Sequence, residues 1–196
     1  TGTIAGSDAD DASSLSYSGA AAGTYGSIAV DSSTGAWTYT LDNADADTTA
    51  LDAGDSVQDA FTMTVSDSAS SETDTMTVTI TITGANDAPD AGSDGTGAVT
   101  EDATTSTATG SVSATDDDDS AAFTYTGDAT GTYGSIAVDS SGAWTYTLDN
   151  SDADTTALDA SDSASDAFTL TVSDGTASDT MTVTITITGA DDDVSA

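Results

Sequence analysis

Aspartate clusters recur in pairs of equivalent places in this sequence, each at the end of a run of alternating apolar residues. They are residues 7–11 and 115–119, 41–42 and 148–149, 65–67 and 172–174, and 84–89 and 189–193. Calcium takes about six to eight oxygen ligands in irregular geometry, so closely spaced carboxylates in loops suit it. A single Asp-x-Asp is also ordinary turn chemistry, because aspartate is a common turn residue. The repeated clustering favours calcium binding over solvated turns alone.

The charge balance also favours a metal partner. The 196 residues include 35 acidic side chains and neither lysine, arginine nor histidine. Each carboxylate must therefore be solvated, held in a turn or bound to a metal ion, and crowding them into a fold costs self-repulsion. The same composition argues against nucleic-acid binding, which needs basic residues for the phosphates. It argues against an enzyme too, because a serine nucleophile would lack its usual base. No apolar run is long enough to insert into a membrane.

These clusters belong to one repeat and most of another. Residues 23–33 recur unchanged as 131–141, 35–43 as 142–150, and 74–85 as 179–190. The period is about 105 residues, which is the size of a domain. We predict a domain at 1–87 that lacks its first strand, a complete domain at 88–192, and the start of a next repeat at 193–196. We expect a window from a longer array; if the chain starts at Thr1, a neighbouring subunit could fill the strand position.

The elements that must position the aspartates are strands. Apolar residues alternate with threonine in 37–41, 61–65 and 76–82, which puts one face into a core and the other toward solvent. About seven such strands per repeat, separated by turns, predict an all-β antiparallel sandwich. The first strand is expected around 98–104, and 45–53 is the one helical candidate. The predicted core contains Trp37, Tyr39, Leu41, Phe61, Val65, Ile80 and Ile82, with their counterparts in the second repeat.

Residues 114–118, 131–136, 142–150, 166–174 and 185–189 carry a family resemblance that covers nearly the whole chain. They resemble bacterial cadherin-like repeats, specifically the VCBS-type domains of large surface adhesins. The resemblance implies tandem seven-stranded antiparallel Greek-key β-sandwiches of the cadherin or immunoglobulin kind. It also implies Ca²⁺ held between successive domains.

The resemblance to cadherins assigns ligands by position. Cadherins use an early Glu, a Leu-Asp-x-Glu motif and an Asn-Asp linker from one domain, with an Asp-x-Asp motif and a later strand-end Asp from the next. By this assignment, the ligands at the central junction are Asp42, Asn86, Asp87, Asp116, Asp118 and Asp174. The ligands at the outgoing junction are Glu101, Asp149, Asp191 and Asp192, and those at the incoming junction are Asp8, Asp10 and Asp67. Ala44 and Ser151 replace the Glu of Leu-Asp-x-Glu, which implies fewer or weaker ions.

The expected function is structural: calcium-rigidified extracellular spacer repeats of a giant secreted adhesin or matrix fibre, at the bacterial cell surface. The expected partners are neighbouring repeats or neighbouring copies in a fibre, with glycans or cell surfaces reached through other domains. The alternative is a self-assembling filament subunit, joined end to end or by strand donation. A ligand- or ice-binding face is a third possibility, because threonines alternate along 75–83. A solvated β face is the favoured explanation of those threonines, since threonine suits exposed strands.

Overall fold

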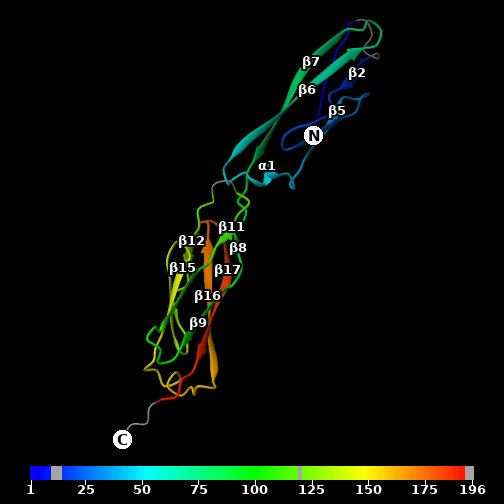
Figure 1. The fold of residues 1–196 in the computed structure, drawn as a ribbon. Helices are drawn as coiled ribbons and strands as arrows, with labels where there is room; N and C mark the ends of the chain where they lie inside the picture. Colours follow the sequence, from blue (N-terminus) through cyan, green and yellow to red (C-terminus); the bar gives the residue numbers. More distant parts are fainter. Residues whose placement is uncertain (10–14, 119–120, 193–196) are drawn as a thin grey trace. The chain divides into compact units, whose positions relative to one another are not determined.

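The computed structural model of the protein describes residues 1–9, 15–118 and 121–192, and the chain divides into two compact units (Figure 1). Unit 1 is Thr1–Asn86 and unit 2 is Asp87–Ala196. Two predictions lie outside the described residues: that Asp10 is a metal ligand, and that 193–196 begin a further repeat.

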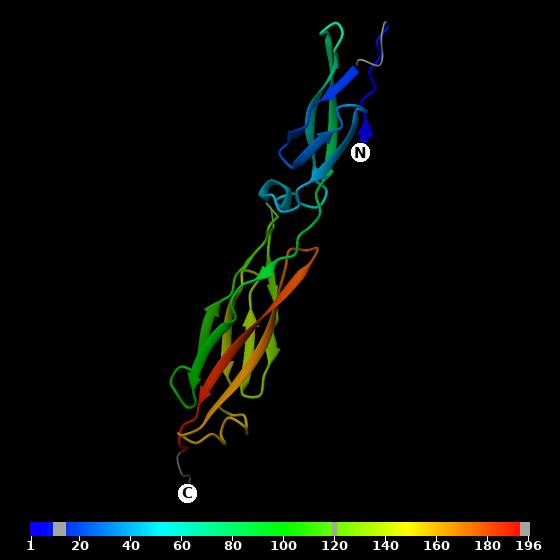
Figure 2. The same cartoon turned by 90° about the vertical axis from the view of Figure 1, so that its right-hand side faces the viewer.

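Unit 2 contains two four-stranded sheets that enclose one apolar core (Figures 1 and 2). One sheet has the order β10-β15-β14-β13, formed by Thr107–Ser111, Ala143–Leu148, Gly134–Val138 and Ala129–Thr130. The other has the order β12-β16-β17-β9, formed by Thr124–Thr126, Ser163–Ser173, Ser178–Thr188 and Gly95–Thr100. Both sheets bury side chains in the core, Tyr146 from one and Leu170 and Ile185 from the other.

The opening segment of unit 2 closes the edge of its second sheet. β8 (Asp90–Ala91) pairs with β11 (Ala114–Thr115), and β9 then runs parallel to β17. This parallel pair departs from the otherwise antiparallel pattern. β9 ends earlier than the range expected from the sequence, because a turn begins at Glu101 and Asp102 takes a positive φ of 52°.

Unit 1 has two corresponding sheets, and its second sheet has one strand fewer than that of unit 2. One has the order β1-β5-β4-β3, formed by Gly2–Thr3, Ala36–Leu41, Gly26–Val30 and Ala21–Ala22. The other has the order β2-β6-β7, formed by Leu15–Ser18, Ser56–Asp67 and Thr73–Thr83. Its core centres on Ile28, Phe61 and Met63. The helix α1 (Ala46–Thr49), shorter than the predicted 45–53, begins after Asp45, whose side chain accepts a hydrogen bond from the N–H of Asp47.

The sequence pattern explains these strands, and the predicted all-β sandwich is confirmed. In β15 the aromatic and aliphatic side chains are buried while the intervening threonines are exposed, as an alternation with period two requires. The predicted core is correct for unit 2 but only partly for unit 1. Leu148 is 4% exposed, whereas its counterpart Leu41 is 36% exposed.

Candidate metal centre

The ends of β9 and β17 bring Glu101 beside the segment that leads to Asp191. Thr100 lies opposite Thr188, and the N–H of Glu101 donates to the carbonyl of Thr188 at 2.9 Å. The N–H of Ala190 donates to Oε2 of Glu101 at 3.1 Å. Two of the acids predicted at the outgoing junction, Glu101 and Asp191, therefore lie on adjacent segments.

Glu101 is a buried carboxylate whose hydrogen bonding is incomplete. Its side chain is 2% exposed, and among the described residues its Oε1 has no hydrogen-bond partner. Burial of a carboxylate without a partner is strongly unfavourable, since neither water nor an opposite charge stabilises it. The chain has no lysine, arginine or histidine to supply that charge. A bound cation would satisfy this oxygen.

Further candidate ligand oxygens belong to the segment that follows β15. The N–H of Leu148 donates to the carbonyl of Ser106 at 2.8 Å, which holds the loop after Glu101 against the end of β15. Figures 1 and 2 both place the segments after β9, β15 and β17 at the same end of unit 2. Asp149 comes next, and its Oδ1 accepts hydrogen bonds from the hydroxyl and the N–H of Ser151 at 2.6 and 2.9 Å. These bonds, the hydroxyl first, lower the pKa of Asp149, which keeps it ionised at neutral pH.

Asn150 is a candidate ligand that the sequence prediction does not include. Its Oδ1 is buried and has no hydrogen-bond partner in the described part of the chain. One sign of this role is visible in the sequence, because Ser151 stands where the resemblance to cadherins leads us to expect a Glu. A calcium site that lacks this carboxylate needs another oxygen ligand nearby. An amide oxygen is a common calcium ligand.

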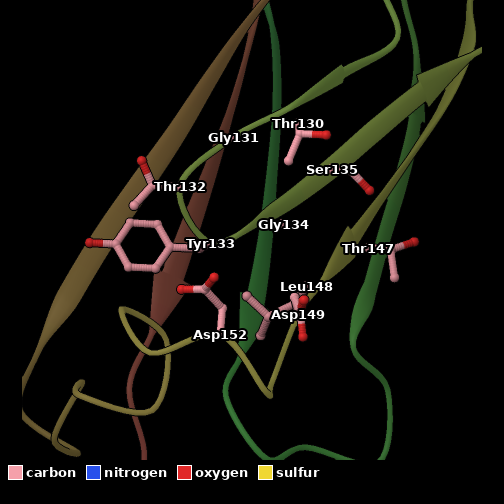
Figure 3. A pocket seen from close by; sticks show the side chains of 10 residues that line it. All are labelled: Thr130, Gly131, Thr132, Tyr133, Gly134, Ser135, Thr147, Leu148, Asp149 and Asp152. Atoms are coloured by element: carbon pink, nitrogen blue, oxygen red, sulfur yellow. The ribbon is translucent and has the colours of Figure 1, made fainter.

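Asp149 and Asp152 line an open cavity of about 400 Å³ (Figure 3). The other wall is the loop from Gly131 to Gly134, with the ring of Tyr133 among the side chains drawn. The N–H of Asp149 donates to the carbonyl of Tyr133 at 2.9 Å. The position of this loop therefore sets the position of Asp149.

A buried aspartate fixes that loop. Asp166 on β16 is 4% exposed and accepts hydrogen bonds from the N–H groups of Thr132 and Tyr133 at 2.8 and 3.1 Å. It also accepts one from the hydroxyl of Tyr146 at 2.8 Å. Burial, followed by this bond to Asp166, raises the pKa of Tyr146. One sign of this role is visible in the sequence, since Asp166 has the same strand phase as Phe168 and therefore points inward.

Unit 1 repeats this buried arrangement. Asp59 accepts from the N–H groups of Thr24 and Tyr25 at 2.8 and 3.2 Å and from the hydroxyl of Tyr39 at 2.8 Å. Burial and then the bond to Asp59 raise the pKa of Tyr39 to about 12. The buried aspartates thus lie inside each sandwich, where each accepts hydrogen bonds from three donors.

The opposite end of unit 2 gathers three of the acids predicted for the central junction. The N–H of Asp87 donates to Oδ2 of Asp118 at 3.1 Å, and the N–H of Asp118 donates to Oδ1 of Asp116 at 3.0 Å. Oδ2 of Asp116 is buried and has no hydrogen-bond partner among the described residues. Like the end near Glu101, this end therefore has a buried carboxylate oxygen without a hydrogen-bond partner in the described part of the chain, close to other acidic residues.

Strand-end aspartates hold turns in both units. Asp174 accepts from the N–H groups of Thr176 and Ala177 at 2.6 and 2.7 Å, and Asp67 accepts from those of Ala69 and Ser70 at 2.9 and 2.8 Å. These bonds close the turns that join β6 to β7 and β16 to β17. A ligand role for Asp67 or Asp174 would therefore be added to a structural one.

The remaining predicted ligands in unit 1 lie in separate places. Asp8 and Asp67 line a cavity of about 380 Å³ beside β2 and β7. Asp42 is exposed and accepts a hydrogen bond from the N–H of Ala44 at 3.0 Å, and Asn86 is the last residue of the unit. At the end of unit 2, Asp191 accepts from the N–H of Ala160 at 3.3 Å, and Asp192 is exposed.

The donor set fits a hard cation, although the carboxylates are not gathered around one point. Within residues 1–9, 15–118 and 121–192, no group of three or more His, Cys, Asp or Glu side chains is arranged to hold a metal ion. One oxygen each of Glu101 (Oε1), Asp116 (Oδ2) and Asn150 (Oδ1) is nevertheless buried and has no hydrogen-bond partner among these residues. Carboxylate and amide oxygens without nitrogen or sulfur are the ligands that calcium prefers.

The fold and these acidic ends define a class: tandem β-sandwich repeats of the cadherin type. The helix that is described is short, and none in the described ranges is long and apolar enough to cross a membrane. The chain belongs to the bacterial cadherin-like domain family, whose model matches residues 1–84 and 86–189. Domains of this type generally bind calcium and generally serve structural or adhesive roles.

Solved cadherin structures with TM-scores of 0.50 and 0.51 agree on the fold. Human protocadherin-24 EC1-2 is 16% identical, with a TM-score of 0.51 over 97% of this chain and 88% of that one. Human CDH23 EC21-23 is 16% identical, with a TM-score of 0.50 over 90% of this chain and 58% of that one. The protocadherin GammaB4 extracellular domain is 14% identical with a TM-score of 0.46, and the match spans only 28% of its length. No curated protein matches the sequence.

Proposed function

We propose that this chain is a pair of non-enzymatic, calcium-binding spacer repeats from a secreted or cell-surface bacterial protein, such as a large adhesin or matrix fibre. The observation that carries the proposal is Oε1 of Glu101, a buried carboxylate oxygen without a hydrogen-bond partner in the described part of the chain. The family supports it, because cadherin-like domains generally bind calcium. The composition supports it too, because no side-chain cation exists to take the place of the metal.

At the end of unit 2, the candidate ligands are Glu101, Asp149, Asn150, Asp191 and Asp192. Glu101 is held by Thr188 and Ala190, and Asp149 by Ser151 and Tyr133, so the strands and the loop prepare these carboxylates before any ion binds. Bound calcium would supply positive charge to carboxylates that otherwise repel one another. Asp87, Asp116 and Asp118 form the second candidate group, with Asp42, Asn86 and Asp174 as further predicted ligands.

The proposed consequence is mechanical. The acids at each end belong to segments that lead into or out of a repeat, so ions bound there would limit how those segments bend. Two repeats stiffened in this way would hold a distal binding domain away from the cell. We expect the partners to be neighbouring repeats, with any glycan or surface target recognised by other domains.

The test is calcium titration of the full chain by calorimetry, combined with thermal melting in calcium and in chelator. We expect binding in the range of about 10⁻⁴–10⁻³ M, typical of extracellular modules, and a higher melting temperature with calcium, since binding to the folded state stabilises it. Small-angle scattering should show a narrower distribution of dimensions in calcium. Magnesium should have a weaker effect, because it requires tighter octahedral geometry.

Glu101→Gln with Glu72→Gln as the matched control sharpens this test. Glu72 is the other glutamate of the chain and is exposed in the β6–β7 turn. In a Trp37→Phe background, Trp144 fluorescence reports unit 2 alone. We expect Glu101→Gln to raise by about tenfold or more the calcium concentration needed to stabilise unit 2. Even the loss of a residue that only supports a metal ligand lowers metal affinity by about 10- to 100-fold. Calcium stabilisation that is equal in the two variants would contradict the assignment of Glu101.

A filament subunit, joined end to end or by strand donation, is the second candidate. In the described part of unit 1, β7 pairs only with β6, whereas β17 pairs with both β16 and β9. We take residues 1–87 as a repeat that lacks this first strand. Electron microscopy of the isolated chain separates the candidates, because filaments support self-assembly whereas dispersed monomers in calcium favour the spacer.

A further inference from the structure

Two parallel strands of unit 2, β9 and β17, lie side by side and are the first and the last strand of their sheet along the chain (Figures 1 and 2). Their register places Gly95 opposite Val183 and Thr100 opposite Thr188. The chain therefore enters β9 at the Gly95 end of the pair and leaves β17 at the Thr188 end. The two points at which the chain joins this pair are thus at opposite ends of it.

This arrangement decides how tension along the chain would act on the pair. Tension would draw β9 toward its own start and β17 toward its own end, so the strands would be sheared past one another. The hydrogen bonds of a parallel ladder are evenly spaced, so shear loads all six residue pairs together. Tension applied to the same end of both strands would instead break the pairs one after another. The strand order therefore favours resistance to tension along the chain.

β9 is the strand that such tension would release. β17 is also paired with β16 along its whole length, Ser178–Thr188, whereas β9 pairs with β17 alone in the described part of unit 2. Val99 anchors β9 in the core, where it is 6% exposed. A shift of one residue would turn this side chain to the other face of the sheet. Release of β9 therefore exposes apolar surface as well as breaking the ladder.

Gly97 prevents β9 from moving stepwise along β17. A Cβ on Gly97 would lie 2.9 Å from Cδ1 of Ile185 and 3.0 Å from Cη2 of Trp144, closer than ordinary van der Waals contact. If β9 moved toward its own start by one or two residues, Ala98 or Val99 would take this position. Either side chain would overpack the core there, which is unfavourable. The pair therefore has to separate completely rather than slip from one register to the next.

Two acidic side chains connect the same strands beyond the ends of the ladder. Oδ1 of Asp94, just before β9, accepts a hydrogen bond from the N–H of Thr182 at 2.7 Å. Oε2 of Glu101, just after β9, accepts one from the N–H of Ala190 at 3.1 Å. Both bonds join a β9 flank to the β17 segment, so shear would load them together with the ladder. The pair is thus braced at both of its ends.

We propose that the parallel pair of Gly95–Thr100 with Val183–Thr188 is a tension-bearing clamp, fixed in register by Gly97 and Val99 and braced by Asp94 and Glu101. The inference rests on the proposed spacer role, in which a force on a distal domain passes along the chain. It adds to that role the element of the repeat that carries the force. The contacts of the clamp are all made by protein atoms, so its resistance does not require calcium.

Single-molecule stretching of the full chain in chelator tests the clamp. The chain has no cysteine, so introduced thiols attach the handles at chosen residues. Ser93→Cys with Thr188→Cys loads the pair in shear, whereas Ser93→Cys with Ser178→Cys pulls on the same end of both strands. All three residues are exposed, and unit 1 lies outside both stretched segments. Because forced unfolding follows the unfolding rate, we expect an unfolding force several times higher in shear at the same pulling speed.

Asp94→Ala, with Asp128→Ala as the matched control, tests the brace. Both aspartates are exposed and accept one backbone N–H at 2.7 Å, but Asp128 accepts it from Val138, away from the clamp. We expect Asp94→Ala to unfold about fivefold faster at a fixed shear force, the effect of losing one hydrogen bond, and Asp128→Ala to leave the rate unchanged.

Equal unfolding forces in the two pulling directions overturn the clamp, as does an Asp94→Ala effect no larger than that of Asp128→Ala. The calcium titration of the same chain is a separate result. A chain that binds calcium but has equal forces in both directions refutes the clamp and leaves the proposed function intact. A chain that resists shear but binds no calcium does the reverse.

Discussion

Units 1 and 2 contain the same strand sequences and bury them to different degrees. Trp144 is buried in unit 2, while Trp37 is half-buried in unit 1. Tyr146 and Ile185 are inaccessible, while Tyr39 and Ile80 are partly exposed. The sheets correspond strand for strand apart from β8, β9 and β11. The presence of the segment that contains β8 and β9 therefore accounts for the difference.

This comparison teaches that one strand completes the core for several others. β9 covers β17, and the loop after it reaches Leu148 through the hydrogen bond to Ser106. Without that segment, Leu41 and Met76 are exposed at positions far apart in the sequence. The inner parts of both sandwiches, where Phe61 and Phe168 lie, remain equally buried. Three predictions test this comparison of the two units, in order of decreasing expected effect.

The largest expected effect is at the covered strand itself. Ile185→Ala should destabilise unit 2 by about 2–5 kcal/mol, because it leaves a cavity in a fully buried site. Ile80→Ala should cost unit 1 less than half as much, since that side chain is already partly exposed. Urea denaturation measures both, with Trp144 fluorescence in a Trp37→Phe background and Trp37 fluorescence in a Trp144→Phe background. Phe168→Ala and Phe61→Ala are the matched controls, and equal costs of the two isoleucine changes would break the comparison.

The buried aspartates should behave alike in the two units. Asp166→Asn and Asp59→Asn place an amide group among three hydrogen-bond donors, so each should cost about 1–3 kcal/mol. The donors and their distances are nearly the same in both units. The same denaturation experiment tests this. A much smaller cost for Asp59→Asn would extend the difference between the units into their interior.

The smallest effect is alkaline destabilisation through the buried tyrosines. The pKa of Tyr39 is raised to about 12 by burial and by Asp59, and that of Tyr146 is raised for the same reasons. A raised phenol pKa contributes stability that is fully present below the unfolded value of about 10 and is lost as pH rises through the folded value. We expect constant stability from neutral pH to pH 9 and a decline above pH 10. Tyr39→Phe and Tyr146→Phe should flatten this decline in their own units; a decline that persists in both variants would assign it to other groups.

Much of the fold was predictable because it depends on local pattern. The alternation of threonine with apolar residues gave β5, β6 and β7, and Asp31 closes a turn because its carboxylate can reach the N–H groups of Ser33 and Thr34. The exposure of Leu41 was not predictable from its strand, since its neighbours are identical to those of Leu148. It depends on a segment that is distant along the chain.

For the candidate site, the sequence indicated which carboxylates recur but not which oxygens are unsatisfied. Glu101 stood in the predicted set, yet its burial results from the parallel pairing of β9 with β17. Asn150 was missed because an asparagine after Leu-Asp reads as a turn residue. Asp67 and Asp174 were predicted as ligands, and their hydrogen bonds also close the turns beside them.

The sequence alone determined the repeat, the strand class, and the inward phase of Asp59 and Asp166. These depend on side-chain spacing and charge, which are properties of the chain. Only the tertiary structure decided that Glu101 is enclosed with an unsatisfied oxygen and that identical strands have different neighbours. Burial is a property of what packs against a residue, and two identical segments differ whenever one of them lacks that contact.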